Sequence, residues 1–334
     1  MTPDPLRSDL GLTVEERRDR ARRRTQRERR VAAAGAGVVL LAAAAFAVAQ
    51  LGGSDTAGGA SSHGRSVPQP DSPPQLPRGG RELLPDYRVV ALYGAPQDDQ
   101  LGELGIGTPA QAAEKLLAQC RPYDRPHRPV MPAFELIATL VTADPGDDGR
   151  YRYRQSDEVI DRYLAAARRA KALLILDVQP GRARFMDEVR AYRRYLEQPD
   201  VGLALDPEWS MRPGQVPGQV IGSTDAPVVN QVSAYLAKLV AAEDLPQKLL
   251  IVHQFTSGMI RHKPALAQRA GVALVINVDG FGDRANKISK YRLFARAGSP
   301  WFNGFKLFYH EDLHLLAPRM VLALRPRPNV VIYE

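Results

Sequence analysis

Apolar runs alternate with amphipathic stretches from Arg81 to the end of the chain. Runs such as 173–176 and 249–252 are apolar on both faces, which is typical of parallel strands that are covered by helices. Eight such runs predict strands, at residues 88–93, 132–139, 172–177, 201–206, 248–253, 272–278, 304–309 and 329–333.

The stretches between these runs have the spacing of helices. One helix is predicted to begin at Pro109, after a Thr108 cap. Five more are predicted at 156–170, 183–196, 229–242, 264–270 and 286–296. Eight alternating strands in a domain of about 250 residues predict an α/β fold of the (β/α)8 TIM-barrel type. A doubly wound open sheet would alternate in the same way, but its common forms have about five or six strands.

The net charge of +8 is concentrated near the N-terminus. Residues 1–30 hold ten arginines against six acidic residues, which is +4, and leave +4 for the rest of the chain. We therefore predict a basic cytoplasmic tail over 1–30 and no nucleic-acid partner for the folded domain.

Residues 31–51 contain no charged side chain. At 1.5 Å per residue such a helix would cross a hydrocarbon core of about 30 Å, so a single transmembrane helix is predicted. The preceding arginines place the N-terminus in the cytoplasm and the remainder outside the cell membrane. A cleaved signal peptide is the alternative, because Ala47-Val48-Ala49 has the small-x-small spacing of a cleavage site. Residues 52–80, rich in Gly, Ser and Pro, predict a disordered linker, and 81–334 the barrel domain.

The fourth predicted strand ends in Asp206-Pro207-Glu208-Trp209. TIM barrels carry their chemistry at the C-terminal ends of the strands, and neighbouring carboxylates can push their pKa values apart. Glu208 is the candidate general acid, Asp206 or Asp177 would tune it, and Asp279 is a candidate partner. Candidate substrate contacts are Trp209, Gln179, His253, Gln254, Asn277, Tyr309 and Tyr333, which lie at or just after strand ends.

This Asp-x-Glu resembles the strand-four motif of glycoside hydrolase families 18 (chitinases) and 25 (lysozyme-like muramidases), which are TIM barrels. The resemblance implies that Glu208 is the proton donor and Asp206 its assisting carboxylate. Chitinases carry two further Asp residues upstream, where this chain has Val201 and Ala204. Muramidases have an Asp at the end of strand one, where this chain has Tyr93. A barrel that binds carbohydrate, or acts as an envelope scaffold, without cleaving is therefore the alternative.

A second motif, His310-Glu311-Asp312-Leu313-His314, matches the zinc-protease pattern and makes a zinc hydrolase the third alternative. It follows directly on a predicted strand, and Pro318 limits any helix there, so Glu311 and Asp312 are predicted as first-turn acids of a short helix. The single Cys120 excludes an intrachain disulfide and a multi-cysteine zinc site. We predict no metal and no cofactor, and a carbohydrate or cell-wall polymer as the partner of a membrane-anchored, extracytoplasmic barrel.

Overall fold

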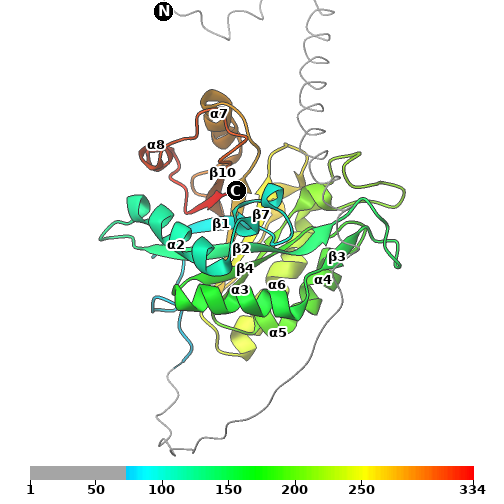
Figure 1. Cartoon of the computed structure of the whole chain (residues 1–334), viewed down its shortest axis with the longest axis horizontal. Helices are drawn as coiled ribbons and strands as arrows, with labels where there is room; N and C mark the ends of the chain where they lie inside the picture. The colour runs from blue at the N-terminus through cyan, green and yellow to red at the C-terminus, as the bar shows by residue number, and fades with distance from the viewer. Residues whose placement is uncertain (1–72) are drawn as a thin grey trace, which may run out of the picture.

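The computed structural model describes residues 73–334, and these form an α/β structure around a closed barrel of parallel strands (Figure 1). The barrel strands are β1 (Arg88–Gly94), β2 (Val130–Val141), β4 (Leu173–Val178), β5 (Val201–Leu205), β7 (Lys248–Gln254), β9 (Val272–Val278), β10 (Phe302–Leu307) and β11 (Val330–Tyr333). Each pairs in parallel with the next, and β1 pairs with both β2 and β11, which closes the sheet. All eight predicted strands are confirmed, and the open-sheet alternative is wrong.

Helices surround the strands on the outside (Figure 1). They are α2 (Pro109–Cys120), α3 (Asp157–Arg169), α4 (Phe185–Ala191), α5 (Arg193–Leu196), α6 (Ala226–Ala242), α7 (Arg284–Phe294) and α8 (Pro318–Ala323). The Thr108 side chain caps α2 in a capping box with Gln111, as the Thr-Pro sequence predicts. Ser156 and Asp283 cap α3 and α7 through the same type of side-chain hydrogen bond.

Short elements fill the connections. They are the strands β3 (Arg152–Arg154), antiparallel to β2, and the pair β6 (Thr224–Asp225) and β8 (Ile260–Arg261), together with the 3-10 helices η2 (Asp99–Leu101), η3 (Glu103–Gly105), η4 (Arg121–Tyr123), η5 (Pro207–Trp209) and η6 (Lys263–Ala265).

The helix predicted over 264–270 is wrong. Only η6 forms there, because a side chain of α6 provides hydrogen-bond partners for the backbone at the end of η6 and just after it. Asn230 on α6 donates to the Ala265 carbonyl and accepts from the Ala267 amide, each at 2.8 Å. These bonds replace the ones that a helix would have made within itself.

Strand alternation divides the hydrophobic core into two layers. One layer lies between the strands and the helices and includes Phe134, Leu203 and Phe305. The other fills the lumen with residues such as Ala204 and Ile251.

Leu76, Leu83 and Leu84 belong to the lumen layer and pack at its N-terminal end. The Gln247 side chain, just before β7, accepts from the Leu83 and Leu84 amides. The barrel unit therefore begins before residue 81, within the range predicted as linker.

The predicted tail (1–30), transmembrane segment (31–51) and most of the predicted linker (52–80) lie outside the described residues. Within 73–334, no helix combines the length and the apolar character needed to cross a membrane.

Candidate active site at the C-terminal end of the lumen

Every barrel strand contributes a polar side chain to the C-terminal end of the lumen. These side chains are Tyr93 (β1), Glu135 (β2), Asp177 (β4), Asp206 (after β5), His253 (β7), Asn277 (β9), Lys306 (β10) and Glu334 (after β11), and Asp279 follows Asn277 on the same face. The same faces of the strands are apolar toward the other end of the lumen. Polar groups therefore gather where TIM barrels carry their chemistry.

The Tyr93 hydroxyl joins two of the carboxylates. It lies 3.2 Å from Asp177 Oδ2 and 3.3 Å from Asp206 Oδ2. The Gln179 amide donates to both the Tyr93 oxygen and Asp206 Oδ2, at 3.2 Å each. Burial, followed by the charge of Asp206, raises the pKa of Asp177 well above its usual range.

His253 lies between two other carboxylates and is completely buried. Its Nδ1 is 2.9 Å from Asp279 Oδ2, and its Nε2 is 2.8 Å from Glu135 Oε1 and 3.8 Å from Asp206 Oδ1. Burial lowers the pKa of His253, but the combined charges of Asp206, Glu135 and Asp279 outweigh burial and raise it well above its usual value. Asn277 Nδ2 lies 3.3 Å from the same Nδ1.

Lys306 supplies a positive charge to the same lumen. Its Nζ lies 2.7 Å from Glu334 Oε2 and 3.5 Å from Asp279 Oδ2. Burial opposes its charge, but these two carboxylates prevail and raise the pKa of Lys306. Burial also favours the neutral form of Asp279, yet Lys306 and His253 hold the pKa of Asp279 below its usual range.

Glu208 stands on η5, directly after the β5 end. Glu208 as a whole is half-buried, but its Oε2 atom is buried and has no hydrogen-bond partner among the described residues. Burial and then the charges of Asp206 and Asp279 raise the pKa of Glu208 well above its usual range. Its backbone carbonyl accepts from the Gly222 amide at 2.7 Å. A Cβ on Gly222 would lie 2.5 Å from the Ser210 carbonyl oxygen, so this close approach requires glycine.

Other acceptors in the network also lack partners. Glu135 Oε2, Asp206 Oδ1 and Asn277 Oδ1 are buried and accept no hydrogen bond from the described residues. Potential metal-ligand atoms of Glu135, Asp177 and His253 lie within 4.8 Å of one another. The network thus has free acceptor capacity and a cluster of side chains that could hold a cation.

Most of the predicted site residues are brought together. Asp177, Gln179, Asp206, His253, Asn277 and Asp279 are members of this hydrogen-bonded network. Glu208 lies close enough for the charges of Asp206 and Asp279 to raise its pKa. Trp209 follows Glu208 on η5 and is half-buried.

Three predicted substrate contacts lie elsewhere. Gln254 follows lumen-facing His253 and therefore faces outward, where it accepts from Lys263 Nζ at 2.7 Å. Tyr309 and Tyr333 stack on each other with ring centres 5.2 Å apart. The Tyr309 hydroxyl bonds Gln119 of α2 and the Tyr333 hydroxyl bonds Tyr123 of η4, so both side chains belong to the outer layer.

Sequence reasoning did not select Glu135, Lys306 or Tyr93 as site residues. Glu135 and Lys306 lie inside strands rather than after them, and Tyr93 was considered only as a departure from the muramidase pattern. The available signal is a charged residue inside an apolar run, since such a residue is buried only with partners.

The zinc-protease pattern does not form a helix. Residues 309–311 form a turn, His310 and His314 are exposed, and His314 has a φ of 61°. The predicted helix at Glu311 and Asp312 is therefore wrong. Asp312 instead turns inward, where it accepts from the Phe308 and Gly282 amides and pairs with Lys287 at 3.2 Å.

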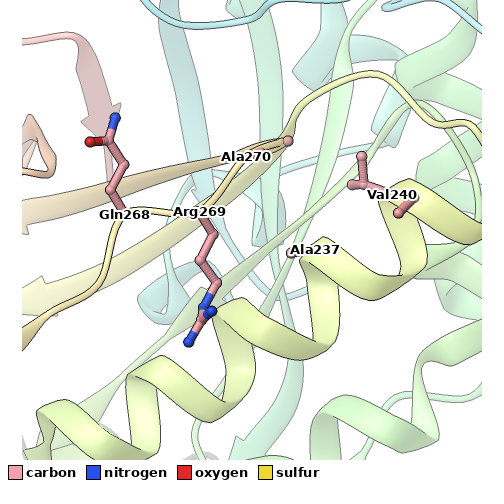
Figure 2. Close-up of a pocket in the computed structure, with 7 residues that line it drawn as sticks. Ala237, Val240, Gln268, Arg269 and Ala270 are labelled. Atoms are coloured by element: carbon pink, nitrogen blue, oxygen red, sulfur yellow. The ribbon is translucent and has the colours of Figure 1, made fainter.

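A surface depression lies outside the barrel, between α6 and the segment before β9 (Figure 2). It is lined by Ala237, Val240, Ala241, Gln268, Arg269, Ala270 and Gly271. The Arg269 guanidinium already donates to Ser233 Oγ at 3.1 Å and to the Asn230 carbonyl at 3.4 Å. This depression adjoins the start of β9, at the opposite end of that strand from the polar network.

No protein-family model matches this chain, and a search of curated proteins finds no match.

Proposed function

We propose that the barrel hydrolyses a glycosidic bond in a carbohydrate of the cell envelope, with Glu208 as the proton donor. The observation that supports this most directly is the Glu208 carboxyl group, which has a buried, unpartnered oxygen beside the buried carboxylates of the lumen. Burial and the neighbouring carboxylates raise its pKa, which favours the protonated form that a general acid needs.

In the proposed reaction, Glu208 transfers its proton to the bridging oxygen as the bond between that oxygen and the sugar C1 breaks. The Asp206 carboxylate, whose Oδ1 atom is unpartnered, stabilises the positive charge that develops on the sugar ring. A water molecule then bonds to C1, and its proton returns to the Glu208 carboxylate. The balanced result is cleavage of one glycosidic bond by one water molecule.

The proposal also includes a membrane anchor. The uncharged run of residues 31–51 follows a cluster of arginines, which supports a cytoplasmic N-terminus and an extracytoplasmic barrel. Cell-wall polymers are the carbohydrates that such a tethered barrel would meet.

The test is to incubate the full-length protein with peptidoglycan, chitin, and α- and β-glucan fragments, and to compare Glu208→Gln. This variant keeps the shape of the side chain and removes its acidic proton. We expect wild-type protein to release product and Glu208→Gln to do so about 10²- to 10⁴-fold more slowly. The exposed Glu311→Gln serves as the matched control and should behave as wild type.

Equal product release from wild type and Glu208→Gln would contradict the assignment of Glu208. A second candidate is a barrel that binds carbohydrate or acts as a scaffold without catalysis. It is favoured by Ala204 and Tyr93, which stand where the chitinases and the muramidases, respectively, carry aspartates. Saturable binding of a glycan fragment to both forms, without release, would support that candidate.

A further inference from the structure

We propose that the lumen binds one divalent metal ion through Glu135, Asp177 and His253. The three side chains come from β2, β4 and β7, and each is completely buried. Their candidate ligand atoms lie within 4.8 Å of one another, so small side-chain movements suffice to close them around an ion. Glu135, Asp177 and His253 take no part in the proposed bond cleavage, so the inference does not depend on that reaction, although Asp206, which the reaction uses, lies beside the site.

Unpartnered acceptors at this position point independently to a cation. Glu135 Oε2 is buried and has no hydrogen-bond partner among the described residues, although Glu135 Oε1 is 2.8 Å from His253 Nε2. Asp206 Oδ1 is likewise unpartnered and lies 3.8 Å from the same Nε2. Leaving a carboxylate oxygen buried without a partner is costly, and one bound cation would satisfy both atoms.

The orientation of His253 suits a metal ligand. Its Nδ1 lies 2.9 Å from Asp279 Oδ2, and this contact holds the ring with Nε2 facing Glu135, 2.8 Å from Oε1. In many metal sites, the ring nitrogen of a ligating histidine that does not bind the metal is hydrogen-bonded to a carboxylate.

The charges in the lumen favour the same conclusion. Lys306 is paired with Asp279 and Glu334. His253 is the group that pairs with Glu135 and approaches Asp206. A divalent ion would add positive charge directly beside Glu135 and Asp177, whereas the ion pairs of Lys306 are with Asp279 and Glu334.

The chemistry of the three ligands indicates which divalent ions would bind. Two carboxylates and one imidazole suit Zn²⁺ or Mn²⁺, whereas Mg²⁺ and Ca²⁺ prefer sites made entirely of oxygen. Three protein ligands would leave further coordination positions, and Asp206 Oδ1, 3.8 Å from His253 Nε2, is an additional donor.

Calorimetric titration of the full-length protein provides the test. The protein carries no polyhistidine tag, is stripped with EDTA and dialysed, and is titrated separately with ZnCl₂, MnCl₂ and MgCl₂. We expect one equivalent of Zn²⁺ or Mn²⁺ to bind more tightly than Mg²⁺, and the same ion to raise the unfolding temperature. Glu135→Gln and Asp177→Asn should each weaken binding at least tenfold, and Asp279→Asn by about 10- to 100-fold.

Matched controls separate this site from other carboxylates and histidines. Asp200→Asn removes a carboxylate that pairs with Arg168 outside the lumen, and the double variant His310→Ala/His314→Ala removes the exposed histidines. Both should bind metal as wild type does. Glu208→Gln should also bind normally, so failure of the metal site and failure of the proposed hydrolysis are distinguishable.

No stoichiometric binding of Zn²⁺ or Mn²⁺ by the wild type would overturn the proposal, whether or not the variants fold. So would unchanged binding by folded Glu135→Gln and Asp177→Asn, with folding checked by circular dichroism. Loss of the bound equivalent in the His310→Ala/His314→Ala variant would assign the ion to the surface pattern instead.

Discussion

The Lys306 ammonium lies 3.4 Å from the centre of the Tyr93 ring, inside the closed lumen. This cation–π contact joins β10 to β1 and connects two sets of charges. Lys306 pairs with Asp279 and Glu334, whereas the Tyr93 hydroxyl reaches Asp177 and Asp206. Tyr93 thus contacts the cation of one set with its ring and the carboxylates of the other set with its hydroxyl.

We expect Lys306→Met to lower the free energy of unfolding by about 3–5 kcal/mol, because it leaves the Asp279 and Glu334 carboxylates without their buried cation. Urea denaturation at neutral pH measures this loss, and the loss should shrink at lower pH as these carboxylates take up protons. Lys238→Met, on the exposed surface of α6, is the control and should change the free energy by less than about 0.5 kcal/mol. Equal losses in the two variants would contradict a structural role for the lumen lysine.

Tyr93→Phe keeps the ring under Lys306 but removes the hydroxyl between Asp177 and Asp206. We expect a loss of about 1–3 kcal/mol, since buried carboxylate oxygens lose a hydrogen-bond donor. The measurement is the denaturant midpoint at an unchanged m-value. Tyr87→Phe is the matched control, because the Tyr87 hydroxyl bonds backbone carbonyls in a partly exposed position. A midpoint for Tyr93→Phe no lower than that of the control would show that the bridge adds no stability.

The barrel could be predicted from the sequence because parallel strands buried on both faces form continuous apolar runs, as in 249–252. Which strand side chains face the lumen follows from the strict alternation of residues along each strand. Consecutive residues cannot both face the lumen, so His253 inside places Gln254 outside. The same alternation on β11 places Ile332 in the lumen and Tyr333 in the outer layer.

Glu135 shows why part of the site could not be predicted from strand ends. It lies within the twelve-residue β2, with apolar neighbours on both sides in the sequence. Its partner His253 is 118 positions away, on β7. Only closure of the barrel brings these residues together, so no local pattern indicates which residue pairs with the carboxylate. The absence of the predicted helix at 264–270 has a similar cause. Asn230, whose side chain bonds the backbone of this segment, lies on a different element, α6.

The proposed role of Glu208 predicts how activity depends on pH. A general acid works while protonated, and the pKa of Glu208 is raised by burial and by the charges of Asp206 and Asp279. We therefore expect kcat to fall as pH rises through a value well above the usual glutamate pKa of 4.5. Product release measured across the pH range locates this alkaline limb, and Glu208→Gln should lack it. If kcat of Glu208→Gln falls over the same pH range as that of wild type, the titrating group is not Glu208.

The last prediction concerns Lys248, at the start of β7 and on the outward face of that strand. Its Nζ donates to the Val201 carbonyl at 2.8 Å and to the Gln198 carbonyl, and burial lowers its pKa from 10.5 to about 7. Between these two values, the unfolded chain holds a proton at this site that the folded protein has released. Because the unfolded state then binds more protons, this lysine makes stability rise with pH above about 7, by up to about 1.4 kcal/mol per pH unit.

Urea denaturation at pH 7, 8 and 9 of wild type and Lys248→Met isolates this contribution. Lys287, whose pKa is lowered to about 8 mainly by burial, acts in the same direction, but it is present in both proteins. We therefore expect the free energy of unfolding of wild type to rise more steeply with pH than that of Lys248→Met. Parallel pH profiles would show that Lys248 keeps its proton in the folded protein and that the two carbonyls hold a charged ammonium.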